Sequence, residues 1–227
     1  MQIYFKYILS SISKRKGLPR EAKRSGGFTL IELMVVITIA TVIMTALVVQ
    51  QSSWNDSLAV STQAYELALM IRQAQIYSLG VREYIPTTGD KTFDTGYGVY
   101  FSSENSDDFK RYIFFGDKNK NGEYDAGEQI GDPITFTRGI VTDRFCGVKG
   151  NGQLDDRCSP GHGNVSYLQI SFLRPEPKAH VILWNGGKQP AQNVIAPATI
   201  YLKSPQGKYF YVKVEANGQV STGPFTS

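Results

Sequence analysis

Apolar residues dominate one unbroken stretch near the start of the chain. Residues 28–50 read FTLIELMVVITIATVIMTALVVQ, with one charged residue, Glu32, and with neither proline nor glycine. About 20 consecutive apolar residues are enough for a helix to cross the hydrocarbon core of a membrane. The pattern therefore predicts a transmembrane helix over about residues 28–50.

The helical pattern continues beyond this stretch with two apolar faces. From residue 57 to residue 81 the only helix breaker is Gly80, and Pro86 follows. One face carries Leu58, Tyr65, Leu69, Ile76 and Leu79, and a second carries Ala64, Leu67, Ile71 and Ala74. Spacings of three, four and seven are typical of helix faces. We expect one helix from about residue 28 to about residue 80, within a segment 28–83, and we expect its second half to be covered on more than one side.

The pattern changes after this helix. Residues 84–227 contain short apolar runs between turn residues, which predicts a β-rich domain. The expected strands are 98–102, 111–115, 133–136, 165–173, 179–184, 199–203 and 208–215, with 219–221 as a further candidate. Asn217-Gly218 predicts a hairpin between the last two runs, and the stretch 147–164 reads as a long loop. The predicted fold class is α+β.

Charge is distributed unevenly along the chain. The net charge is +4, but residues 1–27 contain four lysines, three arginines and one glutamate, so the rest of the chain is net −2. Basic residues flanking an apolar span are typical of its cytoplasmic side. Outside this flank there is no basic excess, which argues against nucleic acid as the ligand.

The residues at the junction of flank and span carry a resemblance. Residues 25–32, SGGFTLIE, resemble the prepilin cleavage and methylation motif of type IV pilins and type II secretion pseudopilins. The resemblance implies cleavage by a prepilin peptidase between Gly27 and Phe28, which would remove residues 1–27 as a leader and leave Phe28 to be N-methylated. It also implies that Glu32 acts in processing and in subunit docking.

The same resemblance implies a fold, partners and a location. The fold would be a long helix packed on a small antiparallel sheet. The chain would lie in the inner membrane as a single-pass protein with its globular domain extracytoplasmic, surrounded by lipid until it joins other pilins or pseudopilins in a filament through an inner-membrane assembly platform. No cofactor is required.

Glu32 is also notable on physical grounds. A carboxylate within hydrocarbon is costly unless it is paired, and cleavage at Gly27 would create a cationic amine at Phe28 as its partner. The alternative is a glutamate close enough to the membrane surface to reach the headgroups.

Two features favour a pseudopilin or minor pilin. No proline lies between Phe28 and Ile85, whereas many major pilins carry a kinking proline in this span. Residues 167–184 and 198–222 also look like the β-domain of H-type pseudopilins and related minor pilins, which is a less specific resemblance than the leader. The sequence leaves open a secretion, pilus, DNA-uptake or motility system.

Residues 117–128 fit a calcium-loop pattern, D-x-[DN]-x-[DN]-G-x5-E. Side-chain oxygens would come from Asp117, Asn119, Asn121, Asp125 and Glu128, and a backbone carbonyl from Glu123. The flanking residues do not read as the two helices of an EF-hand. The alternative is a polar hairpin loop with solvated acids.

The remaining reactive residues are few. Cys146 and Cys158 would form a local disulfide in an oxidising compartment, or remain two thiols in a loop. His162 and His180 lie in no recognisable nucleophile motif, so we expect no enzyme. The alternative to a structural subunit is a minor pilin at a filament tip that binds a ligand, a surface or DNA. Mixed charge in the loops 103–108 and 147–164 argues against strong phosphate binding.

Overall fold

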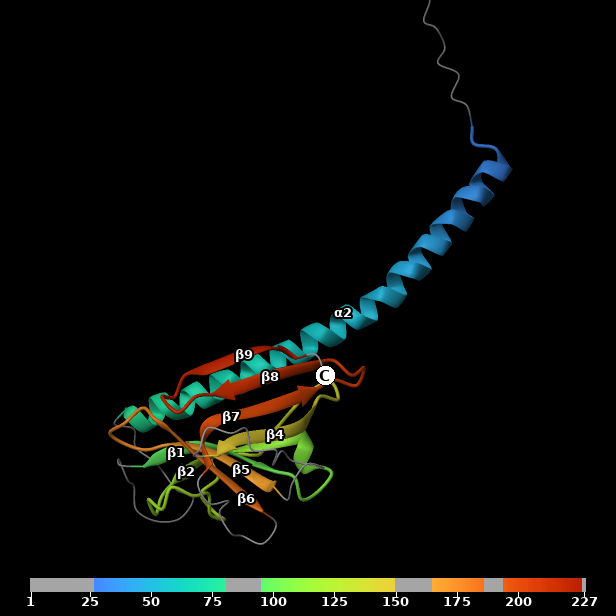
Figure 1. The fold of residues 1–227 in the computed structure, drawn as a ribbon. Coiled ribbons are helices and arrows are strands. Elements are labelled where there is room, and N and C mark those ends of the chain that lie inside the picture. The colour runs from blue at the N-terminus through green and yellow to red at the C-terminus, as the bar shows by residue number, and fades with distance from the viewer. Residues whose placement is uncertain (1–26, 81–94, 150–164, 186–193, 226–227) are drawn as a thin grey trace, which may run out of the picture. The chain divides into compact units, whose positions relative to one another are not determined.

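The computed structural model describes residues 27–80, 95–149, 165–185 and 194–225. These residues form one long helix, a short 3₁₀ turn and two antiparallel sheets (Figure 1). The chain divides into two compact units, Met1–Leu47 and Val48–Ser227. The predicted α+β class is confirmed.

Helix α2 spans Leu30–Leu79 and belongs in part to each unit. It ends where the sequence predicts, because the amide of Gly80 makes the final helical bond to the carbonyl of Ile76 at 2.9 Å. In the first unit every side chain of the helix is exposed, including all the large apolar ones. The helix is long and apolar enough to cross a membrane.

The first sheet has five strands in the order β3-β2-β1-β5-β6, and all its pairs are antiparallel. Its strands are β1 (Gly96–Ser102), β2 (Arg111–Asp117), β3 (Ile134–Thr135), β5 (Val165–Phe172) and β6 (Ala179–Asn185). All five were predicted from the apolar runs. A 3₁₀ turn, η1 (Asp108–Lys110), precedes β2.

The second sheet has four strands in the order β4-β7-β8-β9. Its strands are β4 (Val141–Lys149), β7 (Val194–Lys203), β8 (Tyr209–Val214) and β9 (Val220–Phe225). The predicted terminal hairpin is confirmed, since Val214 pairs with Val220 and Gly218 adopts a left-handed φ of 85° in the turn. The expected loop 147–164 is wrong at its start, because β4 continues to Lys149; residues 150–164 lie outside the described residues.

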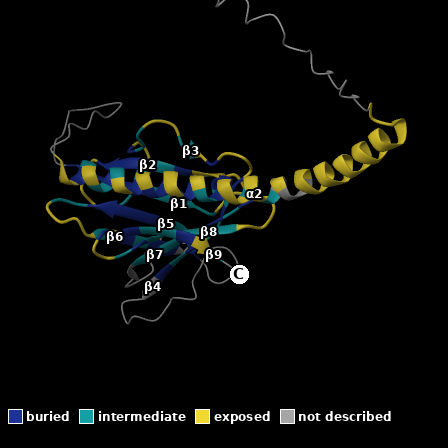
Figure 2. Cartoon of the chain, turned by 90° about the horizontal axis from the view of Figure 1, so that it is seen from above, coloured by how far each residue is buried: buried dark blue, intermediate teal, exposed yellow. Residues whose placement is uncertain are grey.

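The second half of α2 contributes one face to the core. Its buried face includes Ala64, Leu67, Ile71 and Ala74, which join residues of both sheets in one hydrophobic cluster. Long-range hydrogen bonds fix the helix on the strands: Arg72 donates to the carbonyl of Val220, and the hydroxyl of Ser78 accepts the amide of Tyr97. Figure 2 shows buried and intermediate residues alternating with exposed ones along the second half of the helix, whereas the first half is exposed throughout.

The other predicted face is not covered by the described residues of the chain. Leu58, Tyr65, Leu69, Ile76 and Leu79 form an exposed apolar face. Of these, Tyr65 has an aromatic neighbour, Phe210 of β8, at a ring-centroid distance of 6.0 Å. The expectation of cover on more than one side is therefore not met by the described residues of this chain.

Candidate functional site

Three described residues precede the first residue of α2: Gly27, Phe28 and Thr29. All three are exposed, and Phe28 retains 80% of its accessible surface. A Cβ placed on Gly27 would have nothing within 4 Å. The peptide bond between Gly27 and Phe28 therefore lies in an open, non-helical segment, where a peptidase has room on both sides of the bond.

Thr29 and Glu32 define the start of the helix. The hydroxyl of Thr29 accepts the amide of Glu32 at 3.2 Å, and its carbonyl accepts the amide of Leu33 at 3.1 Å. Thr29 is thus the N-cap, and Glu32 occupies the third helical position, as in a capping box. A carboxylate in the first turn also interacts favourably with the positive end of the helix dipole.

Residues 22–48 match the family model of the prokaryotic N-terminal methylation motif. The chain carries a prepilin-type motif. This is the cleavage and methylation motif of type IV pilins and pseudopilins, and it covers the open segment, the helix cap and most of the apolar span. Neither the curated proteins nor the solved structures include a match to the chain.

The motif supports a type IV pilin-like subunit that is processed by a prepilin peptidase and assembles with other pilins. Such subunits are structural proteins rather than enzymes. The exact cleavage bond, the methyl group on Phe28 and the docking role of Glu32 stay predictions. The leader itself, residues 1–26, lies outside the described residues.

The second predicted site is the loop 117–128, which begins at the last residue of β2. Asp117 is fully buried, and its carboxylate accepts the amides of Asn121 at 3.1 Å and Gly122 at 2.8 Å. Gly122 has a φ of 78°, so glycine is required at this sharp turn. The loop therefore turns around the carboxylate of Asp117.

The far end of the loop is held by Glu128, which is also buried. Its carboxylate accepts the amides of Lys118 at 2.8 Å and Asp125 at 3.0 Å. The carboxylate of Asp125 accepts the side-chain amides of Asn119 at 2.7 Å and Asn121 at 2.8 Å. The candidate ligands, Asp117, Asn119, Asn121, Glu123, Asp125 and Glu128, thus lie in one loop.

Calcium binding by this loop stays a prediction. Among the residues that the structure describes, no group of three or more histidines, cysteines, aspartates or glutamates is arranged to hold a metal ion. Asparagine and backbone oxygens, which calcium also uses, would have to complete the site. The loop is not flanked by helices, as the sequence predicts. Strand β2 leads into it, and Gln129 just after it forms an isolated β-bridge with Phe115. The loop is therefore not part of an EF-hand.

The loop folds back over the outer face of the first sheet. Gln169 of β5 is fully buried beneath it, donates to the carbonyl of Gly122 and accepts the amide of Tyr124 at 2.8 Å. The hydroxyl of Ser171 reaches the same carbonyl at 3.3 Å. The sequence did not identify Gln169 and Ser171 as residues that hold the loop. The available signal was that these two polar residues alternate with apolar residues in the strand.

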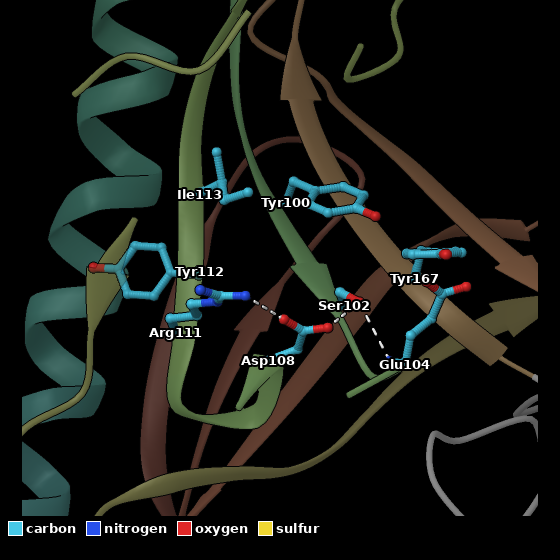
Figure 3. Close-up of a pocket in the computed structure, with 8 residues that line it drawn as sticks. All are labelled: Tyr100, Ser102, Glu104, Asp108, Arg111, Tyr112, Ile113 and Tyr167. Carbon is cyan, nitrogen blue, oxygen red and sulfur yellow. Dashed lines mark hydrogen bonds and ion pairs between the residues drawn. The ribbon is translucent and has the colours of Figure 1, made fainter. Parts of the chain in front are cut away.

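The folded-back loop brings three tyrosines together on this outer face. The ring of Tyr100 lies 4.6 Å from that of Tyr124 and 5.7 Å from that of Tyr167, with Tyr100 and Tyr167 stacked at 25°. Two cavities of about 240 and 310 Å³ share Tyr100 and Tyr167 in their walls, and Trp184 borders the larger one. We call the surface formed by Tyr100, Tyr124, Tyr167 and Trp184 the aromatic groove. Figure 3 shows the smaller cavity.

Acidic groups surround the aromatic groove. Glu104 and Asp108 border the smaller cavity, and Glu123 and Asp125 the larger one. Asp108 is neutralised by Arg111 at 2.7 Å (Figure 3). Arg111 is the one cationic side chain in the described walls of the two cavities, so the described lining of the groove carries a net negative charge.

The surroundings also raise the pKa values of two tyrosines in the groove. Burial, with added repulsion from Tyr167 and Glu104, raises the pKa of Tyr100 far above its ordinary value. Burial and a hydrogen bond to Glu104 raise the pKa of Tyr167 to about 12. Both hydroxyls therefore remain neutral at physiological pH, and the negative charge of the groove comes from its carboxylates.

Of the remaining candidates, Cys146 and His180 lie among the described residues. Cys146 in β4 is disulfide-bonded, and none of the described cysteines is free. Its pairing with Cys158, the other cysteine in the chain, stays a prediction because residue 158 lies outside the described residues. His180 is exposed in β6 opposite Ser171, and His162 lies outside the described residues.

Proposed function

We propose that this protein is a structural subunit, a pseudopilin or minor pilin, of a type II secretion or type IV pilus filament. The observation that carries the proposal is a prepilin-type motif directly ahead of a helix whose apolar side chains are all exposed over residues 30–48. Before assembly these side chains would be solvated by the lipid of the inner membrane, with the leader cytoplasmic and the globular unit outside.

The exposed apolar face of the second unit supports assembly through the same helix. Leu58, Tyr65 and Leu79 are separated by multiples of seven positions, and Leu69 and Ile76 repeat by seven between them. When apolar residues recur at alternating spacings of four and three, two helices can pack side by side along the face that carries them. A row of large apolar side chains in contact with water is costly, so a neighbouring subunit's helix is the proposed cover.

Glu32 would act in this assembly through charge. After cleavage the amine of Phe28 is a cation, and the carboxylate of Glu32 is its proposed partner on the same or on a neighbouring helix. Packing such a pair within apolar helices would fix the axial register, because a shift would leave a charge unpaired.

The absence of a proline between Phe28 and Ile85 favours a pseudopilin or minor pilin over a major pilin. A tip subunit that binds DNA is the less favoured alternative, because the described lining of the aromatic groove has a net negative charge that would repel phosphate. The proposal does not depend on whether the filament secretes proteins or forms a pilus.

The decisive test is the intact mass and N-terminal sequence of the protein purified from its native membrane. We expect a chain that begins at a monomethylated Phe28. The matched control is the same protein from cells that lack the prepilin peptidase, which should retain residues 1–27. An intact leader in peptidase-positive cells would reduce the segment to a plain membrane anchor and contradict the proposal.

A further inference from the structure

The aromatic groove presents ring surfaces from four separate segments. Tyr100 comes from β1, Tyr167 from β5, Trp184 from β6, and Tyr124 from the loop that Gln169 holds against the sheet. Three of these side chains are only partly buried. An aromatic face attracts a cation within about 6 Å of its centre, and several rings around one space add their contributions.

The charge of the groove has the sign that a cation requires. Glu104 lies beside Tyr167 in one cavity, and Glu123 and Asp125 border the other. Arg111 is the cationic side chain among the described residues that line these cavities, and Asp108 already neutralises it. A positively charged ligand would therefore gain from both rings and carboxylates, whereas a phosphate or carboxylate ligand would be repelled.

The size of the groove limits the ligand. The cavities of about 240 and 310 Å³ lie at or below the lower end of the range of about 300–1,000 Å³ for sites that enclose drug-sized molecules. Each is suited to one small group. An amino acid side chain or a small amine fits this size, and an extended polymer would engage the groove through one such group.

We propose that the aromatic groove binds an organic cation of side-chain size, an ammonium or guanidinium group held over Tyr100, Tyr124 and Tyr167 and next to Glu123. The group could belong to a free amine or to a lysine or arginine of a partner protein. This inference is independent of filament assembly, because it concerns the outer face of the first sheet and not the helix.

The test is titration calorimetry on the full-length protein in a non-ionic detergent, with a chelator present to keep metal ions from the loop. One probe is choline, and its control is 3,3-dimethylbutan-1-ol, a neutral molecule of nearly the same shape. We expect choline to bind about tenfold more tightly than the alcohol, which corresponds to about 1.4 kcal/mol. A second arm compares short peptides with a single lysine, arginine or acetyl-lysine.

Variants locate the binding site. Tyr167→Leu removes a ring and should abolish the preference for choline, whereas Tyr167→Phe keeps the ring and should retain it. Glu123→Gln should weaken choline binding several-fold. The matched controls are Tyr209→Leu on the second sheet and the exposed Glu176→Gln, which should have no effect. The emission of Trp184 in a Trp54→Phe background, with and without ligand, gives a second readout and checks the fold of each variant.

The outcomes separate the sources of the cation. Tighter binding of the lysine or arginine peptide than of choline identifies a basic segment of a partner protein, and the reverse identifies a small amine. Equal binding of charged and neutral probes overturns the proposal, as does a cation preference that survives Tyr167→Leu in a folded protein. Neither result bears on N-terminal processing, which is tested separately.

Discussion

Two adjacent aspartates illustrate how strongly a side chain depends on its surroundings. Asp107 is exposed, whereas Asp108 is buried and receives hydrogen bonds from Arg111, Ser102 and Asn105. Burial alone would raise the pKa of Asp108, but these hydrogen bonds together outweigh it and hold the pKa below its ordinary value. The ionised carboxylate therefore stabilises the turn between β1 and β2.

We predict that Asp108→Asn lowers the free energy of unfolding by about 2 kcal/mol at neutral pH. A depressed pKa contributes stability above the pKa of the unfolded chain, near 4, and this contribution is lost as the pH falls through the folded pKa. The difference between the variant and the parent should therefore be constant from about pH 7 to pH 5 and shrink below about pH 4. Denaturant unfolding at several pH values measures it.

Asp107→Asn is the matched control for this prediction. Its carboxylate contacts Lys110 at 2.9 Å but is mostly exposed, so its loss should change stability little at any pH. A loss in Asp108→Asn that persists unchanged at low pH would show that the asparagine disturbs packing and that the charge is not responsible.

The second prediction for individual residues concerns calcium binding by the loop 117–128. We propose that calcium raises the melting temperature of the protein and that Asp117→Ala removes this effect, because it deletes the buried carboxylate around which the loop turns. Thermal melting with calcium and with a chelator measures both. Asp132→Ala, an exposed aspartate just beyond the loop, is the control and should keep the response. An unchanged melting temperature in the parent protein with calcium would contradict calcium binding.

Residues with a local signature were predictable at this scale, and residues defined by tertiary contacts were not. Gly27 and Glu32 follow from the motif because the pattern is continuous in sequence. Gln169 looks like an ordinary outward-facing strand residue, and the loop that buries it lies 47 positions earlier. The grouping of Tyr100 and Tyr167 depends likewise on the register of β1 against β5.

Helix α2 likewise shows that the sequence predicts local features but not the tertiary contacts that bury them. The spacing of apolar residues predicts two faces, and both exist. Which face the domain covers was not predictable, because Ala64, Leu67, Ile71 and Ala74 are on average smaller and no more apolar than Leu58, Leu69 and Ile76. The buried face is the one that contains alanines, since alanine allows the helix backbone to approach the sheets closely.

Two leucines two positions apart make this difference testable. Leu67 is fully buried and Leu69 is 61% exposed. We predict that Leu67→Ala lowers the free energy of unfolding by about 2–5 kcal/mol, whereas Leu69→Ala changes it by less than about 0.5 kcal/mol. In cells, Leu69→Ala should instead reduce the amount of subunit recovered in sheared filaments.

Each variant is the control for the other, since both remove the same atoms. Filament yields must be compared at equal levels of folded subunit in the membrane. Normal incorporation of Leu69→Ala, and of the double variant Leu69→Ala with Ile76→Ala, would mean that the exposed apolar face does not contact a neighbouring subunit.

Strand β4 is the element that the apolar pattern did not reveal. Its sequence, VTDRFCGVK, contains an adjacent Asp143 and Arg144, which pair with each other at 3.1 Å. The pairing with β7 shifts register next to Asp143 and again after Gly147. Such irregularities break the alternation on which strand prediction relies, because the side chains change faces at each shift.

At the scale of the whole molecule, the sequence predicts a helix followed by strands and leaves their arrangement open. The structure divides the strands between a sheet of five and a sheet of four, where one small sheet was expected. β1 pairs with β5 across 65 or more positions, and no local pattern encodes such a partner. This pairing within the first sheet brings Tyr100 next to Tyr167, and the loop that follows β2 adds Tyr124.

The hydrogen bond from Arg72 to the carbonyl of Val220 joins residues 148 positions apart. A chain that is synthesised from its N-terminus presents the helix long before β9, the strand that accepts this bond, has been made. Until then the buried face of the helix lacks part of its cover, and contacts between such distant residues form slowly. The last strand therefore sets the time at which the chain completes its fold, and a chain that ends before β9 leaves part of the buried helix face open to proteases and chaperones.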